Sequence, residues 1–294
     1  MKIRRLPGNP IITPETDPSI GSNINGPSLI RVPKWIDKPL GKYYLYFAHH
    51  TGKHIRLAYS DRLDGPWRII YKPGALRLEN SYFTDHIASP DVMIDDERRQ
   101  IRLYYHGLTP EERTQHTRLA VSKDGIDFVA EKEPVGRGSA YWRLFRFRGW
   151  WYALAMPGRL FRSHDGLTAF EPGPQLFPAS PTQVHNAVMV RGDTLYVFYT
   201  RAGDTPERIL YSKVALGTDW NVWKPGVPHE CLAPEMKWEG VELSILPARI
   251  GALDKPERAL RDPAIFQEAD KTYLLYAIAG ESGIAIAQIE RLGD

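Results

Sequence analysis

Short runs of apolar and aromatic residues alternate with polar turns along the whole chain, and the runs recur in groups of three. In the first group, residues 26–30, 43–48 and 55–60 are each rich in apolar or aromatic side chains. Runs of this length between turn residues predict β-strands, and little of the chain has the 3.6-residue period of a helix. Four further groups follow the same order, at 89–94, 101–105 and 118–122; 141–145, 151–155 and 159–163; 185–190, 195–199 and 209–212; and 261–266, 273–277 and 283–287.

This repeated unit predicts the fold. A unit of roughly 40–50 residues made of short strands is typical of a β-propeller blade. Five such units fit a chain of 294 residues, so we expect an all-β fold, a five-bladed β-propeller in one domain spanning residues 1–294. Two connections, 72–88 and 224–260, are longer than hairpin loops. Such loops are usually functional, although the second one has the simpler alternative of covering a sheet edge.

Blade geometry selects the candidate site residues. Antiparallel pairing brings the starts of the first strands and the ends of the second strands to one mouth of the propeller. Polar groups next to apolar strands need partners or a function. The alternatives are local turn capping for each aspartate and hydrogen-bonded lining for the histidines. The residues selected in this way are Asn25, Asp91, Trp142, Arg143, His185, Asn186, Arg261 and Asp262 from the first strands, and His49, His50, His106, Arg201 and Glu281 from the second.

Composition narrows the function classes. The chain is 43% hydrophobic, 11% aromatic and 25% charged, and a formal net charge of +3 without a Lys/Arg run does not favour nucleic acid. One cysteine, Cys231, excludes an internal disulfide. No stretch approaches the roughly 20 apolar residues of a membrane span, and the N-terminus lacks the apolar run of a secretory signal, so we expect a cytoplasmic protein without membrane contact. The histidines lack metal-ligand spacing, and we predict no metal site and no cofactor.

Two short motifs at the openings of inner strands carry a family resemblance. Pro90-Asp91 and Asp262-Pro263, with five blades, resemble the five-bladed propeller glycosidases. These are the arabinanase, levansucrase and invertase-like enzymes of glycoside hydrolase families 43, 62 and 117, together with the mannoside phosphorylases of family 130. The resemblance covers nearly the whole chain as architecture. For family 43 it implies a general base from an Asp-Pro in the first blade, a pKa-tuning Asp in an Ala-Pro-Asp of the second blade, and a general acid Glu from a later blade.

The resemblance assigns roles to three acids and shows one departure. Ser89-Pro90-Asp91-Val92 is similar to the second-blade motif, which implies that Asp91 tunes the pKa and holds the sugar. Gly26 stands where the first-blade base would be. Because a ring has no intrinsic first blade, Asp262 of the last blade is the candidate base. Glu242 and Glu281 are candidates for the general acid, and Glu242 is preferred because Trp238 beside it offers a surface for a sugar ring.

These inferences predict a glycoside hydrolase that acts on a short oligosaccharide. One carboxylate would activate water while another acid protonates the leaving oxygen. A carbohydrate is therefore the expected partner. Two alternatives stay open: phosphorolysis, with the mouth histidines and Arg143, Arg201 and Arg261 holding phosphate, and a carbohydrate-binding propeller without catalysis, suggested by the missing acid at position 26.

Overall fold

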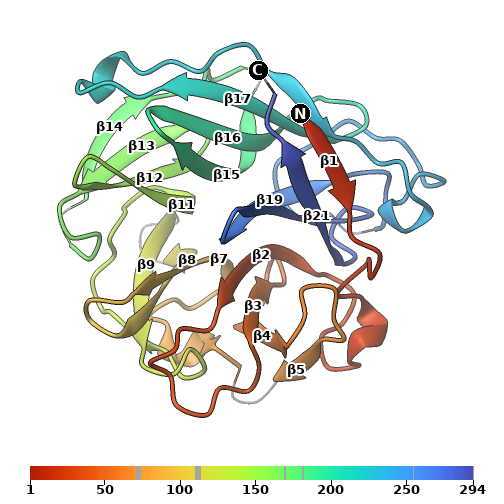
Figure 1. Cartoon of the computed structure of the whole chain (residues 1–294), viewed down its shortest axis with the longest axis horizontal. Helices are drawn as coiled ribbons and strands as arrows, with labels where there is room; N and C mark the ends of the chain where they lie inside the picture. The colour runs from red at the N-terminus through yellow and green to blue at the C-terminus, as the bar shows by residue number, and fades with distance from the viewer. Residues whose placement is uncertain (71–73, 110–113, 169, 181, 254, 294) are drawn as a thin grey trace.

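The strands surround a central axis in five antiparallel sheets (Figure 1), in a computed structural model that describes residues 1–70, 74–109, 114–168, 170–180, 182–253 and 255–293. This arrangement confirms the predicted all-β, five-bladed propeller. The only helical segments within the described ranges are the short 3-10 helices η1 (Pro14–Thr16), η2 (Leu78–Asn80), η3 (Trp220–Val222) and η4 (Lys237–Glu239). No helix in these ranges has the length and apolar character that crossing a membrane requires.

Each blade is a meander whose first strand faces the axis. The strands are, blade by blade, β2 (Asn25–Arg31), β3 (Tyr43–Ala48), β4 (His54–Ser60), β5 (Arg68–Ile70) and β6 (Leu76–Arg77); β7 (Ile87–Asp95), β8 (Gln100–Thr109), β9 (Thr114–Ser122) and β10 (Val129–Ala130); β11 (Ala140–Phe147), β12 (Trp150–Met156), β13 (Arg159–Ser163) and β14 (Glu171–Gln175); β15 (Gln183–Arg191), β16 (Thr194–Arg201), β17 (Ile209–Ala215) and β18 (His229–Leu232); β19 (Arg261–Glu268), β20 (Lys271–Ala277), β21 (Ile284–Arg291) and β1 (Lys2–Arg5). All fifteen strands predicted from the repeat are present, within a few residues of their predicted ends.

The ring closes through a strand that the repeat did not predict. β1 pairs antiparallel with β21, so the N-terminus supplies the outer strand of the last blade, and the two ends of the chain lie close together (Figure 1). Arg5 fixes this closure because its guanidinium binds the fully buried carboxylate of Glu239, with Nε 2.7 Å from Oε1. β1 therefore joins the first residues of the chain to the long 224–260 connection.

The apolar core lies between the blades. Five separate clusters of buried side chains occupy the five blade-to-blade seams; for example, Tyr46, Leu57, Ile87 and Leu103 pack between the first and second blades. The other four seams hold equivalent clusters. Successive side chains of a strand point to opposite faces of its sheet. Both faces are apolar here because each sheet packs against two neighbouring sheets.

All five inner strands contain the same irregularity near their start. The register of β2, β7, β11, β15 and β19 shifts by a β-bulge, and one residue of each bulge has positive φ. These residues are Gly26, Ser89, Tyr141, His185 and Asp262, with φ of 59°, 49°, 60°, 37° and 49°. A bulge re-aims a side chain. The fold thereby presents one selected residue per blade at the mouth of the axis.

We expect Arg5→Ala to lower the free energy of unfolding by about 3 kcal/mol, because it leaves the buried Glu239 carboxylate without its cation. Arg4→Ala is the matched control. Arg4 contacts Glu290 with half of its side chain exposed, so its loss should cost less than about 1 kcal/mol. Urea unfolding of the two variants measures both values, and equal losses would contradict a closure that depends on Arg5.

Candidate active site

Asp262 is the bulge residue of the last blade and the centre of the candidate site. It is 1% exposed, and within the described part of the chain neither carboxyl oxygen has a hydrogen-bond partner. Burial, together with the negative charge of Glu281, raises the pKa of Asp262 well above its usual range. Its surroundings therefore favour the protonated form of the carboxyl, and its oxygens make no hydrogen bond to the described residues of the protein.

Glu281 is equally buried but has the opposite environment. Its Oε2 accepts a hydrogen bond from Asn23 Nδ2 at 2.6 Å, and its Oε1 lies 3.2 Å from His50 Nδ1 and accepts from Arg261 Nη1 at 2.6 Å. Burial opposes ionisation, but these donors and the guanidinium charge outweigh it and lower the pKa of Glu281. Glu281 is the ionised carboxylate of the site.

Arg261 joins this carboxylate to a third one, Glu207. Its Nε lies 3.0 Å from Glu207 Oε2, without the alignment of a hydrogen bond, while Nη1 and Nη2 also donate to the carbonyls of Gly251 and Arg249. Arg261 and Glu207 are both fully buried. Burial raises the pKa of Glu207, and the charge of Arg261 offsets the rise only in part.

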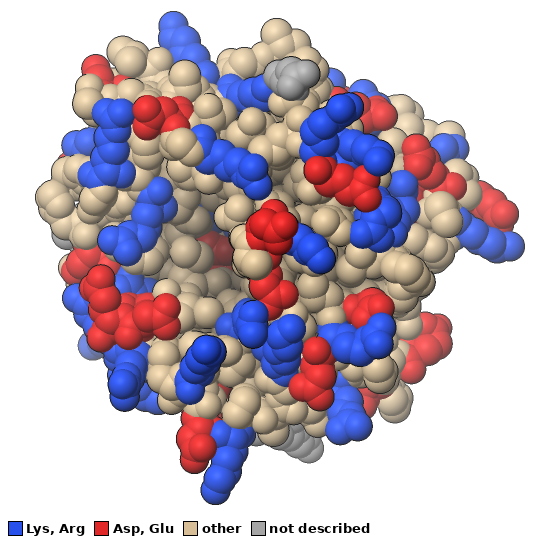
Figure 2. Space-filling view, in the orientation of Figure 1, with Lys and Arg blue, Asp and Glu red and all other residues tan. Residues whose placement is uncertain are grey.

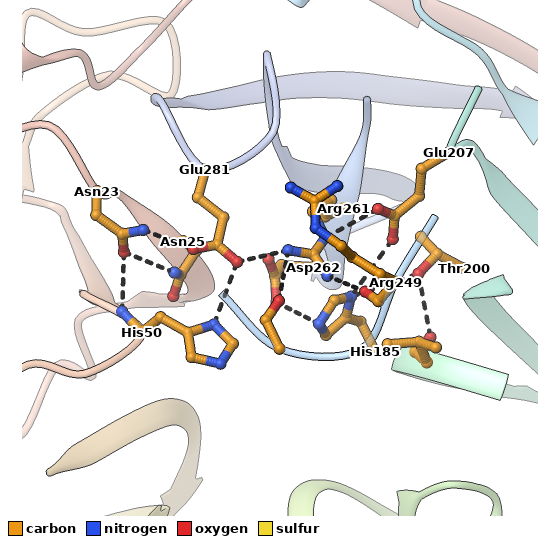
Figure 3. Close-up of polar contacts among 12 residues, drawn as sticks. Asn23, Asn25, His50, His185, Thr200, Glu207, Arg249, Arg261, Asp262 and Glu281 are labelled. Carbon is orange, nitrogen blue, oxygen red and sulfur yellow. Dashed lines mark hydrogen bonds and ion pairs between the residues drawn. The ribbon is translucent and has the colours of Figure 1, made fainter. Parts of the chain in front are cut away.

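His185 lies between two of these acids. Its Nδ1 is 3.8 Å from Glu207 Oε1 and 3.4 Å from Thr200 Oγ1, and its Nε2 is 3.8 Å from Asp262 Oδ1. Burial lowers the pKa of His185 well below its usual range, so the imidazole is neutral. In Figure 3, Glu281 and Asp262 lie between His50 on one side and His185 on the other.

A row of rings extends the site across the mouth. His185 lies against Tyr141 at 4.9 Å between ring centroids, Tyr141 against His106 at 5.6 Å, and His106 against His86 at 6.1 Å. Burial also lowers the pKa of His106 well below its usual value. This surface of aromatic and imidazole rings, in which burial keeps His106 and His185 neutral, is compatible with a polar, uncharged ligand lying next to the acids.

The arrangement is that of an acid–base pair. Two buried carboxyl groups, Asp262 and Glu281, influence each other's ionisation while their pKa values are displaced in opposite directions. Pairs of this kind divide the roles of proton donor and proton acceptor. The site therefore combines the proton of Asp262, the negative charge of Glu281 and the neutral imidazoles of His185 and His106.

Asp91 belongs to a different network from Asp262. Its Oδ2 accepts a hydrogen bond from the backbone N–H of Leu144 at 2.8 Å, and its Oδ1 lies 3.4 Å from Arg143 Nη1. Burial raises the pKa of Asp91, partly offset by Arg143. The neighbour that acts on the ionisation of Asp262 is Glu281, and not Asp91. The partners of Asp91 are Arg143 and the backbone of Leu144, so a catalytic role for Asp91 stays a prediction.

The residues predicted from the long loop are not brought to this group. The side chain of Glu242 is 66% exposed and pairs with Lys237 at 3.4 Å, whereas a general acid needs burial or a like-charged neighbour to raise its pKa. Trp238 packs against the core between the fourth and fifth blades. Trp142 is similarly occupied in the core, where it donates a hydrogen bond to Ser139 and lies against Phe161.

The other predicted lining residues lie at the mouth in varied roles. Asn25 donates to Asn23, and Asn186 donates to the carbonyl of Tyr141. His49 accepts from the backbone of Thr51, while Arg201 is engaged by Asp204 at 2.8 Å. Within the ranges that the structure describes, no group of three or more His, Cys, Asp or Glu side chains has an arrangement that could hold a metal ion.

Sequence reasoning missed Glu207 and Asn23. Glu207 follows the second strand of the fourth blade, just as Glu281 follows the second strand of the fifth. In the fourth blade the polar residue selected at the end of the second strand was Arg201, and Glu207 lies a few residues further into the following loop. Asn23 precedes β2 by two residues, and only its hydrogen bonds to Glu281 and Asn25 show its role.

Comparison with known proteins identifies relatives of this chain. It matches no protein-family profile. It is 35% identical over 98% of its length to "uncharacterized protein R118" of Acanthamoeba polyphaga mimivirus, and the match covers 90% of that protein.

Solved structures share the fold. A putative glycoside hydrolase from Parabacteroides distasonis superposes with a TM-score of 0.69 at 14% identity, covering 99% of this chain and 97% of that one. A thermostable family-43 glycoside hydrolase gives 0.66 at 15% identity, covering 93% and 91%. A family-43 enzyme from Xanthomonas citri complexed with xylose gives 0.64 at 12%, covering 94% and 89%. At these identities the likeness concerns the fold.

We expect Asp262→Asn to stabilise the protein in a pH-dependent way. Because the folded-state pKa of Asp262 is raised, the folded protein binds more protons than the unfolded chain between the two pKa values, and stability falls as pH rises through that interval. The variant lacks this loss. Its Tm should exceed that of the parent at pH 7.5, by about 2–4 °C for each kcal/mol removed, and the difference should shrink towards pH 4.

Asp193→Asn is the matched control, because the Asp193 side chain is 68% exposed and its one ion pair with a described residue is that with Arg148. Thermal unfolding at several pH values should show no comparable trend for it. A lower Tm of Asp262→Asn at pH 7.5, or a difference independent of pH, would show that Asp262 does not carry a raised pKa.

Proposed function

The chain belongs to the family of the mimivirus protein R118 and shares its fold with family-43 glycoside hydrolases, and from this premise we propose that it is a glycoside hydrolase whose reaction centre is Asp262 and Glu281. The opposite displacement of their two pKa values is the observation that carries the proposal. A fold shared at low identity does not by itself specify a reaction. The two carboxyl groups supply the chemistry that the fold leaves open.

The environments assign the two roles. Asp262 holds a proton on a carboxyl group without protein partners, so it is the general acid that protonates the glycosidic oxygen as the bond to the anomeric carbon breaks. Glu281 is the carboxylate that accepts a proton from the attacking water as the new bond to that carbon forms. These roles reverse the expectation that Asp262 acts as the base, because the Asp-Pro motif carries no information on burial.

Hydrolysis is favoured over phosphorolysis by the state of the mouth arginines. Arg261 is occupied by two carboxylates, Arg201 by Asp204, and Arg143 by backbone carbonyls. A phosphate would have to displace these partners before it could bind a guanidinium. A neutral sugar hydroxyl, by contrast, finds the unpaired oxygens of Asp262 and the imidazoles of His50 and His185.

The first substrates to test follow from the neighbours. One of the solved family-43 structures holds xylose, and another neighbour is described as a β-xylosidase/α-arabinofuranosidase. Xylo-oligosaccharides and aryl glycosides of xylose and arabinose are therefore the starting set, each with and without inorganic phosphate. Product formation without phosphate supports hydrolysis.

We expect Asp262→Asn to lower kcat/KM on an unactivated oligosaccharide by about 10²–10⁴-fold, because the proton for the leaving oxygen is lost. The loss should be much smaller on a dinitrophenyl glycoside, whose leaving group needs no protonation. Glu281→Gln should lower turnover on both substrates alike. Initial rates on the two substrates measure this difference.

Asp193→Asn again serves as the control and should keep parental rates on both substrates. Equal losses on both substrates in Asp262→Asn would overturn the acid assignment. Full activity of Asp262→Asn would overturn the proposed reaction centre.

A further inference from the structure

A cavity lies against the outer strands of the second blade, and none of the axial acids lines it. It has a volume of about 800 Å³ and is lined by residues 79, 80 and 82–84 of the connection between the first two blades, by Thr109, by residues of β9 and β10, by Phe128, and by residues 132–134 and 137. Its lining carries both signs of charge, from Glu79 and Glu133 and from Arg118, Lys132 and Arg137, and Figure 2 shows Lys and Arg interspersed with Asp and Glu over the face of the molecule seen in Figure 1. The cavity is therefore not part of a broad cationic surface, and its chemistry depends on individual side chains.

Arg118 is the unusual residue of this cavity. It extends from β9 and is 8% exposed, yet its Nε and Nη1 have no hydrogen-bond acceptor among the residues that the structure describes. Burial lowers the pKa of Arg118 from its ordinary value. An arginine remains charged even so, and a buried charge without acceptors is costly.

Other buried arginines in the chain have acceptors. Arg102 donates to Asp95 and to the carbonyl of Asp165, Arg143 to the carbonyls of Asn186 and Pro90, and Arg261 to Glu281. The guanidinium carbon of Arg118 lies 5.0 Å from the Phe83 ring centroid and 5.8 Å from that of Tyr82, and Glu133 and Arg137 are the charged groups that act on its pKa. A buried polar group that lacks the partners its equivalents have requires an explanation, and an acceptor from a ligand supplies one.

Tyr82 provides the second observation. Its side chain is exposed, and its backbone has φ of 58°, a left-handed conformation that is strained for a residue other than glycine. The adjacent Phe83 is buried and lies edge-to-face on Tyr105 at 5.7 Å, which anchors the turn. The strained turn thus holds the Tyr82 ring in solvent next to the guanidinium of Arg118.

The strand that carries Arg118 also contacts the row of rings. Gln115, three residues before Arg118, lies with its Nε2 3.4 Å from His86 Nε2, and His86 belongs to the row of rings that leads to His185.

We propose that this cavity binds an acidic sugar residue, with its carboxylate on Arg118 and the apolar face of its ring against Tyr82. A guanidinium fork matches a carboxylate in a bidentate pair, in which Nη2 of Arg118 donates together with one of the two unpaired nitrogens, Nε or Nη1. An exposed aromatic ring offers the flat apolar surface that a sugar ring can cover. The sugar part of this inference rests on the proposed function, whereas the anion part rests on Arg118 alone.

Calorimetric titration with glucuronate, glucose and inorganic sulfate tests this inference without requiring turnover. Glucuronate should bind at least tenfold more tightly than glucose, and Arg118→Met should weaken glucuronate at least tenfold. Because this substitution removes an unsatisfied buried charge, the Tm of Arg118→Met should not fall. Arg118→Lys, which keeps the charge without the fork, should weaken binding less and also serves if Arg118→Met does not fold.

Tyr82→Ala separates a sugar site from a simple anion site, because it should weaken glucuronate severalfold and leave sulfate unchanged. Arg31→Met, at an exposed ion pair with Glu268, is the control and should bind as the parent does. Asp262→Asn should also bind glucuronate normally, so a failure of the hydrolase proposal stays distinguishable from a failure here. Absence of binding, equal binding by Arg118→Met, or glucuronate binding that is insensitive to Tyr82→Ala would overturn the proposal.

Discussion

The guanidinium of Arg143 is the contact on which the arrangement of the inner strands depends. Arg143 extends from the inner strand of the third blade and is 3% exposed. It donates hydrogen bonds to the carbonyls of Pro27, Pro90 and Asn186, which belong to the first, second and fourth blades. One side chain thereby joins four of the five blades at the axis. These carbonyls lie in a buried space, where an acceptor without a donor is costly.

The bulges above Arg143 explain where acids can stand. In the first blade the bulge residue is Gly26, and a Cβ there would approach Ser89 Cα to 3.3 Å. The close approach of the first two blades therefore leaves little room for the side chain that the family-43 resemblance places at this position. Asp262 occupies the equivalent bulge of the fifth blade, where it meets His185 instead of a neighbouring backbone. The first blade has a glycine at its bulge and the fifth blade has an aspartate. The acid therefore lies in a different blade from the one that the family-43 resemblance implies, while the backbone of the two bulges is the same.

The sequence predicted the strands well because each blade repeats the same apolar pattern. Pro90 and Pro263 marked the openings of two inner strands, where the structure has bulges, at which a sheet tolerates proline. The sequence did not predict β1, since four residues with three basic side chains have no repeat to match and gain their strand conformation from pairing with β21. It selected Asp262 and Glu281 through strand polarity. It preferred Glu242 because Trp238 is its sequence neighbour, and sequence proximity does not reveal that Trp238 packs into a seam while Glu242 faces solvent.

Charge balance explains why the axial acids differ. Asp262, Glu207 and Glu281 are buried around a single buried guanidinium, that of Arg261, because the imidazole of His185 is neutral. In a space of low dielectric, one cation compensates about one carboxylate. Glu281 takes that place through its 2.6 Å contact with Arg261 and its further donors Asn23 and His50. Glu207 and Asp262 are left with raised pKa values. Of these two, Asp262 is the one without a cation against its oxygens, so the site's most readily available proton lies on the bulge residue that faces the axis.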